Sequence, residues 1–149
     1  MWIRTICKAD YSSVDRLLLQ LHQVDVSGRP DLFSPADHYM SRDAFETLLE
    51  NQNVFAFLAQ ERLEAVGCCF VSLLEKHGVK TAYIDLLVVD EKHRRQGIGR
   101  ALFREIQKQA RKLGAKNVEL MVWSYNQTAV KAYESYGMTP QRSIYEARV

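Results

Sequence analysis

The sequence predicts a mixed α/β fold in a single domain, residues 1–149, with about four helices and a central, mostly antiparallel sheet. Two observations favour this fold. The residue pattern follows the order β-α-α-β-β-β-α-β-α-β. Its middle, residues 54–89, holds three consecutive strands joined by short turns, which is typical of an antiparallel meander. This order differs from the regular strand–helix alternation of a doubly wound parallel sheet.

The first third of the chain predicts a strand, two helices and a long loop. Residues 2–8 alternate as a strand, and Asp10 is then expected to cap the first helix. The polar stretch from about His22 to Ser41 is predicted as a loop, and loops of this length are often functional. The apolar stripes of the two helices are Val14, Leu17, Leu18 and Leu21, and Ala44, Phe45, Leu48 and Leu49.

The rest of the chain predicts five strands and two helices. The strands are expected at residues 54–59, 65–74, 82–89, 118–122 and 144–147. A helix with a clear apolar stripe starts near Gly97, and Gly114 suits the position just after its end. A further helix is expected from Asn126 to Tyr136, ending at Gly137.

Composition indicates a folded protein in the cytoplasm. The 149 residues are 47% hydrophobic and 26% charged, and no apolar run approaches the roughly 18 residues that cross a bilayer. The first residues lack the apolar stretch of a signal peptide. The net charge of +2 is too small to indicate a nucleic acid as partner. We therefore expect neither a membrane nor a nucleic acid as partner.

The three cysteines do not form a metal-binding pattern. Their odd number fits a reducing compartment. Cys68 and Cys69 are adjacent on a predicted strand, so their side chains should point to opposite faces of the sheet. We therefore expect no metal site.

Cations gather where the helix near Gly97 begins. Lys92, Arg94, Arg95 and Arg100 surround this helix start, where the helix dipole is already positive. A bound anion would reverse this repulsion by pairing with the free backbone N–H groups and the arginines. Gly97 and Gly99 would let the backbone approach such a ligand closely.

The identity of this anion stays open on the turn alone. The Walker pattern requires a Lys and a Ser or Thr that are absent here. The dinucleotide pattern requires a third glycine at position 102, which is Leu. A free phosphate, or a solvated basic helix start without a ligand, would also fit the turn.

Two motifs resemble those of the GCN5-related N-acetyltransferases (GNAT). The first is Arg94-Arg95-Gln96-Gly97-Ile98-Gly99, which follows the strand-like segment Tyr83–Asp90. The second runs from Asn126 through Ala129 and Tyr133 to Gly137 and Met138, with Met in place of the usual aromatic residue. The order of the remaining elements also agrees, so the resemblance covers the chain.

The resemblance implies that acetyl-CoA is the co-substrate. In this family the fourth and fifth strands splay apart, often with a bulge in the fourth, and the pantetheine arm enters the gap. The coenzyme-binding residues carried over are Leu87, Val88, Val89, Arg94, Arg95, Gln96, Gly97, Ile98, Gly99, Arg100 and Asn126. Asn126 has the alternative role of capping its helix.

The resemblance also implies direct attack of a primary amine on the thioester, through a tetrahedral intermediate. Tyr133 matches the family's general acid, which protonates the departing thiolate or holds it by a hydrogen bond. Asp85 is the first candidate for the general base because it lies inside an apolar strand. Its side chain should share a face with Tyr83 and Leu87 if no bulge intervenes. Glu119 is the alternative base, since Met121 occupies the position where some members have a Glu.

The acceptor site is expected at the loop between the first two helices and at the strand ends. Acidic residues of that loop would attract a cationic amine. The candidate acceptor-site residues are His22, Asp31, Phe33, Trp123 and Tyr125. The acceptor is expected to be a small-molecule or peptide amine, and the protein a monomer or homodimer. Two alternatives remain open: a non-catalytic acyl-CoA sensor, and an acyltransferase that uses another acyl-CoA.

Overall fold

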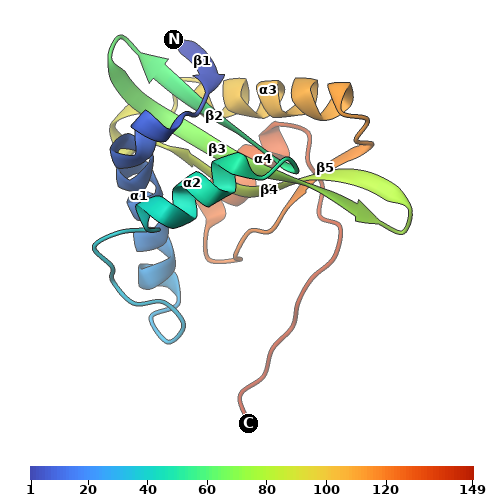
Figure 1. Cartoon of the computed structure of the whole chain (residues 1–149). Helices are drawn as coiled ribbons and strands as arrows, with labels where there is room; N and C mark the ends of the chain where they lie inside the picture. The colour runs from blue at the N-terminus through green and yellow to red at the C-terminus, as the bar shows by residue number, and fades with distance from the viewer.

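Five strands form one sheet in which spatial order equals chain order, β1-β2-β3-β4-β5. The computed structural model describes residues 1–149. The strands are β1 (Trp2–Thr5), β2 (Val54–Glu61), β3 (Glu64–Lys76), β4 (Val79–Val89) and β5 (Asn117–Leu120). Neighbours pair antiparallel except β4 and β5, which pair parallel across the connection that contains α3 (Figure 1). The predicted mixed α/β fold with a mostly antiparallel sheet is therefore confirmed.

Helices cover both faces of the sheet. The four helices are α1 (Tyr11–Gly28), α2 (Arg42–Glu50), α3 (Ile98–Lys112) and α4 (Gln127–Ser135), and short 3₁₀ turns lie at Lys8–Asp10 and Glu91–His93. Helices α1 and α2 bury Leu17, Leu18 and Phe45 against one face. Helix α3 buries Leu102 and Ile106 against the other. Each side of the sheet thus has its own apolar layer.

The neighbouring cysteines show that β3 contributes side chains to both apolar layers. Cys68 belongs to the layer under α1 and α2, and Cys69 belongs to the layer under α3. Both thiols are fully buried, and burial raises the pKa of Cys69 to about 12. The expectation that they point to opposite faces is confirmed, and both side chains act as small apolar groups.

The first helix is longer than predicted, and its N-cap carboxylate has a different partner. Helix α1 continues through His22 and Asp25 to Gly28, so the loop covers only residues 29–41. Asp10 lies at the start of α1, but its carboxylate does not cap the helix. It accepts both guanidinium N–H groups of Arg4 at 2.8 Å and the backbone N–H of Cys7. Asp10 therefore occupies the predicted N-cap position, but it makes no capping hydrogen bond because Arg4 takes its carboxylate.

The last predicted strand, residues 144–147, is also wrong. Residues 138–149 have no regular structure, and the chain leaves the sheet as an extended tail (Figure 1). Ile144 and Tyr145 are 83% and 92% exposed. The alternating pattern is present, but a strand also requires a neighbour that supplies hydrogen bonds, and none lies beside this segment.

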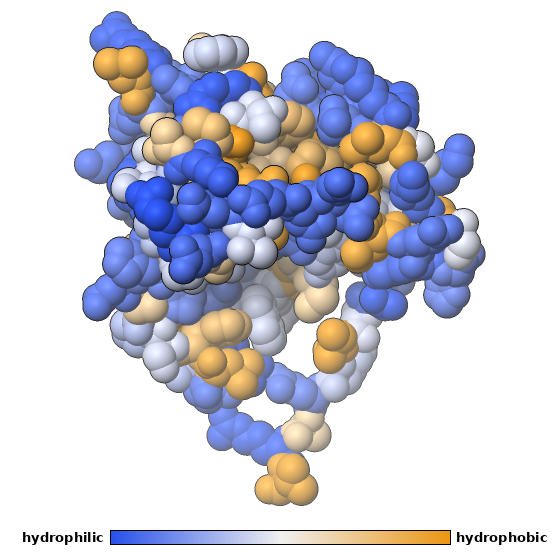
Figure 2. Space-filling model, in the orientation of Figure 1, coloured by the Kyte–Doolittle hydropathy of each residue, from blue (hydrophilic) through white to orange (hydrophobic).

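The surface is largely hydrophilic on the face that Figure 2 shows, with smaller apolar areas between the charged groups. The lower half of this face is hollowed between the part that carries the end of α1 and the extended tail. None of the helices is long and apolar enough to cross a membrane.

Candidate active site

The turn between β4 and α3 places free backbone N–H groups beside unpaired cations. Helices α2 and α4 start with side-chain caps, from Ser41 and Asn126, whereas α3 starts at Gly97 without one. The first N–H groups of α3 are therefore available to a ligand. None of the ion pairs of the protein involves Lys92, Arg94, Arg95 or Arg100.

The conformation of this turn also suits an anion. Gly97 has φ +80°, and a Cβ there would meet no atom within 4 Å, so the space beside it is open. Arg95 has φ +62°, which is rare for a residue with a side chain. Left-handed residues in a turn aim successive N–H groups into one concavity, and such a concavity binds anions. A Cβ on Gly99 would lie 2.5 Å from the Tyr136 hydroxyl, so this glycine is required for packing.

Strand β4 has a bulge at Asp85 and loses its neighbour at the same point. Phe70 of β3 pairs with Leu86 and Val71 pairs with Ile84, which leaves Asp85 as the extra residue. Pairing between β4 and β5 ends at Ile84, and β4 then continues alone to Val89 on that side. The predicted splay of the fourth and fifth strands, with a bulge in the fourth, is confirmed.

Main-chain groups of β4 point into the resulting gap. The N–H of Asp90 donates to Val66 of β3 at 2.8 Å. Because main-chain groups alternate along a strand, those of Leu87 and Val89 face the opposite side, where β5 has ended. These are the two residues whose main chain was predicted to pair with pantetheine.

The bulge overturns one prediction about Asp85. Ile84 and Leu87 pack in the layer under α3, whereas Leu86 packs in the layer under α1 and α2. Without a bulge Ile84 and Leu86 would share a face. Asp85 therefore does not share a face with Leu87, although its charge still raises the pKa of neighbouring Tyr83, where burial is the larger cause.

The two candidate bases have different surroundings. Asp85 accepts a hydrogen bond from Ser72 Oγ at 2.5 Å, and the partial loss of hydration around it raises its pKa against the effect of that bond. Glu119 accepts from Lys76 Nζ at 2.5 Å and from Gln141 Nε2 at 3.2 Å. The bond from Lys76 is the main cause of the lowered pKa of Glu119. A paired carboxylate of low pKa is a weak base, so the geometry favours Asp85.

Tyr133 lies on α4 and is partly buried. Its hydroxyl has no intramolecular hydrogen bond, and its ring meets that of Tyr136 edge to face at 6.2 Å. Burial, with a smaller contribution from Tyr136, raises the pKa of Tyr133 to about 12. The group therefore stays protonated and able to donate at neutral pH. Asn126 caps α4 by accepting from the Ala129 N–H at 3.3 Å, which is the alternative role predicted for it.

Four of the five predicted acceptor-site residues form one row of rings. The centroids of His22 and Phe33 lie 6.2 Å apart, those of Phe33 and Trp123 6.0 Å, and those of Trp123 and Tyr125 5.7 Å. Asp31, the fifth, instead pairs with Arg29 at 2.9 Å. Arg29 also reaches Glu146 of the tail and lies 5.4 Å from the Trp123 ring.

A groove of about 910 Å³ joins this row to the anion-binding turn. Helix α1 forms one side, from Ser12 to Gly28, and Glu91, Arg94 and Tyr125 lie opposite. Tyr125 donates its hydroxyl to Asp25 at 2.6 Å, and its ring packs directly against Gly28. Two residues that the sequence analysis singled out, Arg94 of the turn and Tyr125 of the acceptor site, thus line the same groove.

The chain matches a known protein family over most of its length. The family model described as Acetyltransferase (GNAT) family matches residues 19–138. This protein belongs to the GNAT family. The resemblance seen in the two motifs is thereby confirmed, and the family supports an acyltransferase.

Two curated relatives of this GNAT protein are N-acetyltransferases by name. The uncharacterized N-acetyltransferase YobR of Bacillus subtilis is 31% identical over 108 residues, which are 72% of this chain and 41% of YobR. The L-ornithine N5-acetyltransferase of Arabidopsis thaliana is 38% identical over 119 residues, 69% of this chain and 51% of that enzyme. The chain thus spans about half the length of these relatives or less.

Solved structures share the complete fold. A mutant of the BH1408 protein from Bacillus halodurans matches with TM-score 0.96 at 28% identity, covering 100% of this chain and 99% of that one. The aminoglycoside N-acetyltransferase AAC(6')-Iy, in complex with CoA, matches with TM-score 0.76 at 16% identity and 99% coverage of both chains. The second likeness shows the fold alone.

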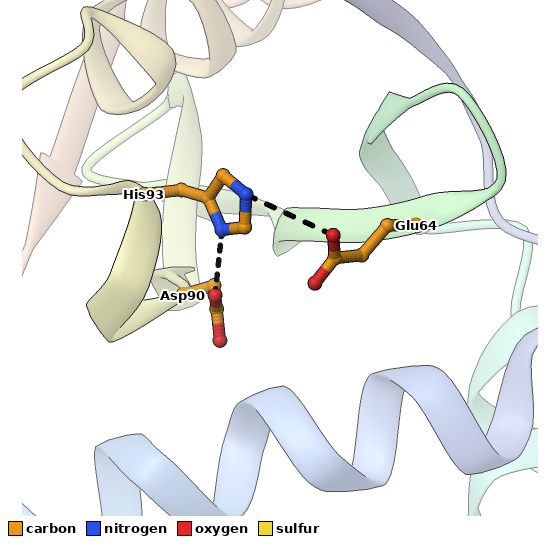
Figure 3. Close-up of side chains that lie close together, drawn as sticks. All are labelled: Glu64, Asp90 and His93. Atoms are coloured by element: carbon orange, nitrogen blue, oxygen red, sulfur yellow. Dashed lines mark hydrogen bonds and ion pairs between the residues drawn. The ribbon is translucent and has the colours of Figure 1, made fainter.

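In this GNAT protein a buried carboxylate, Asp90, anchors the turn between β4 and α3, and the sequence analysis did not single it out as functional. Asp90 accepts hydrogen bonds from Arg16 at 3.1 Å and Gln20 at 2.8 Å, both on α1, and lies 2.7 Å from His93 Nδ1. His93 Nε2 in turn lies 3.8 Å from Glu64 (Figure 3). No local sequence signal reveals this cluster, since its members come from three distant segments.

The Asp90 cluster is better explained as a structural anchor than as a metal centre. Ligand atoms of Glu64, Asp90 and His93 lie within 4.8 Å of one another, a spacing that a cation could use. The guanidinium of Arg16 beside Asp90, however, already supplies a positive charge. Burial opposes ionisation of Asp90, but hydrogen bonds from Gln20, His93 and Arg16 outweigh it and lower the pKa to about 2.

The Asp90 anchor predicts a particular acid sensitivity. The pKa of Asp90 is lower in the folded state than the roughly 3.9 of an unfolded chain. Its contribution is therefore complete above about pH 5 and is lost as the pH falls towards 2. We expect Asp90→Asn to lower the free energy of unfolding by about 1–3 kcal/mol at pH 7 and to flatten its decline in acid, as measured by urea unfolding.

The matched control for this prediction is Asp37→Asn, which changes an exposed loop carboxylate that has no hydrogen bond or ion pair. It should behave as wild type at every pH. If the free energy of unfolding of Asp90→Asn falls in parallel with that of wild type from pH 6 to pH 2, the assignment of Asp90 as an anchor is contradicted.

Proposed function

We propose that this protein is an N-acetyltransferase that moves the acetyl group of acetyl-CoA to a primary amine. The observation that carries the proposal is the uncapped start of α3, ringed by four unpaired cations and adjacent to the unpaired stretch of β4. This arrangement offers a pyrophosphate site and, directly before it in the chain, a strand-like partner for pantetheine. Family membership and the named relatives support the acyl transfer.

The residues present suit coenzyme A. The backbone N–H groups from Arg95 to Arg100 would hold the pyrophosphate, with the arginines neutralising its charge. The main chain of Leu87 and Val89 would pair with the pantetheine amides as β5 pairs with the first half of β4. Acetyl-CoA supplies the acyl group as an activated thioester.

The chain's own groups would then guide the transfer. An amine with a pKa near 10.4 is mostly protonated at pH 7, so Asp85 accepts its proton directly or through water. The amine lone pair forms the new C–N bond at the thioester carbonyl carbon, while the N–H near Leu87 stabilises the charge on oxygen. The C–S bond then breaks and the electron pair leaves on sulfur. The nitrogen releases its second proton to solvent as the amide forms, and the thiolate gains a proton to become free CoA.

The raised pKa of Tyr133 supports a hydrogen-bonding role over proton donation. A thiol has a pKa of about 8.5, whereas that of Tyr133 is about 12. Complete proton transfer from this phenol to the thiolate would be unfavourable by roughly 5 kcal/mol at these values. Tyr133 is therefore assigned to hydrogen bonding with the departing sulfur, which receives its proton from solvent.

Calorimetry and a thiol assay test the proposal as a whole. We expect acetyl-CoA to bind and an amine panel to release free CoA thiol. Binding without thiol release for any amine would favour the acyl-CoA sensor. Tighter binding and faster turnover with a longer acyl-CoA would favour another acyl donor. The absence of binding by both acetyl-CoA and CoA would refute the proposal.

Tyr133→Phe should lower kcat by about 10- to 100-fold, because it removes one hydrogen bond to a developing charge and keeps the ring. Steady-state kinetics and acetyl-CoA calorimetry should show little change in coenzyme affinity. Tyr136→Phe is the matched control on the same helix and should keep kcat. Equal effects of the two substitutions would remove Tyr133 from this role.

Asp85→Asn should reduce the rate most at low pH, where the free amine is scarce, by about 10²-fold or more at pH 7. The deficit should shrink towards pH 10. Ser72→Ala removes a hydrogen bond that lowers the pKa of Asp85, so the acidic limb of the pH–rate profile should move to higher pH. A profile that neither substitution alters would assign proton removal to another group or to water.

A further inference from the structure

Two carboxylates, Asp25 beside the aromatic row and Asp85 at the bulge of β4, have no ion-pair partner. Asp25 and Asp85 both act on Tyr39, whose pKa is raised first by burial and then by the charges of these two groups. Asp25 accepts only from the Tyr125 hydroxyl, at 2.6 Å, and Asp85 only from Ser72. Tyr39 packs in the layer under α1 and α2 together with Leu86, the residue after Asp85, and its hydroxyl has no intramolecular hydrogen bond.

Two cations of this region are already paired with other carboxylates, whereas Arg142, whose charge opposes the rise in the pKa of Tyr83, is in no ion pair. Lys76 pairs with Glu119, and Arg29 pairs with Asp31 and Glu146. No ion pair of the protein includes Asp25 or Asp85. Asp25 on α1 and Asp85 at the bulge of β4 are therefore both free to pair with a cationic ligand.

Aromatic rings connect these two places. Tyr39 lies 6.1 Å from His22, and the row continues through Phe33 and Trp123 to Tyr125, which holds Asp25. The chain itself places a cation on this row, since Arg29 lies over Trp123. Aromatic faces attract ammonium groups, and carboxylates at both ends strengthen this preference.

We propose that the acceptor is an aliphatic diamine or polyamine, whose reacting amine lies at Asp85 and whose second ammonium group lies at Asp25 beside Tyr39 and Tyr125. This inference rests on the proposed acetyl transfer and adds the chemistry of the acceptor. A monoamine would leave Asp25 unpaired, and an acceptor with a distal carboxylate would be repelled by it. Asp25 thus selects acceptors that carry a second ammonium group, and Asp85 accepts the proton of the reacting amine.

Three acceptors of similar length test whether the second ammonium group contributes to recognition of the acceptor. With acetyl-CoA and the full-length chain, 1,4-diaminobutane should show a kcat/KM at least about tenfold above that of butylamine, and 5-aminopentanoate should be the poorest of the three. Asp25→Asn keeps an acceptor oxygen for Tyr125 and removes the charge. It should raise KM for the diamine about tenfold, leave butylamine unchanged and therefore abolish the preference. Asp37→Asn, an exposed carboxylate outside the aromatic row, should retain it.

Calorimetry separates failure of this inference from failure of the proposed function. Binding of 1,4-diaminobutane to the protein–CoA complex should weaken about tenfold in Asp25→Asn. If binding of the diamine depends on Asp25 but no amine causes release of CoA thiol, the proposed acetyl transfer is refuted and the proposed diamine site is supported. If amines are acetylated but diamine and monoamine are equal, or Asp25→Asn leaves their ratio unchanged, the inference is overturned and the enzyme stands. If no amine binds and none is acetylated, both fail.

Discussion

The loss of pairing between β4 and β5 after Ile84 is the constraint on which the site depends. Strand β4 continues to Val89 beyond the end of β5, and on that side the Val89 carbonyl accepts only a long hydrogen bond of 3.4 Å from Arg94 Nε. Backbone groups left unpaired there require a ligand or water. The bulge at Asp85 occurs at the same point and moves the following side chains to opposite faces. One local irregularity thus opens the gap and exposes a carboxylate beside it.

Helix α1 ties the two ends of the groove together. Its first half holds Asp90, and with it the turn that leads to α3, through Arg16 and Gln20. Its last turns hold Tyr125 through Asp25 and the packing of Gly28. The anion-binding turn and the acceptor wall are therefore fixed relative to each other by a single rigid element, which favours accurate positioning of two substrates.

Charge is divided along the groove. Unpaired cations surround the start of α3, and unpaired carboxylates lie at the bulge of β4 and near the end of α1. An anionic coenzyme and a cationic amine would each find the opposite charge at its own end. The same charges that would attract each substrate to its end would repel it from the other end.

The sequence by itself determined the order of nearly all elements, the amphipathic α3 and both family motifs, because these depend on residues near one another in the chain. Only the tertiary structure decided the features that depend on distant partners. Helix α1 continues to Gly28 where Tyr125 packs against it, and Glu119 is paired by Lys76. The strand-like residues 144–147 remain irregular because no strand lies beside them. Propensity and periodicity are local, whereas hydrogen-bond partners across the sheet are set by the complete fold.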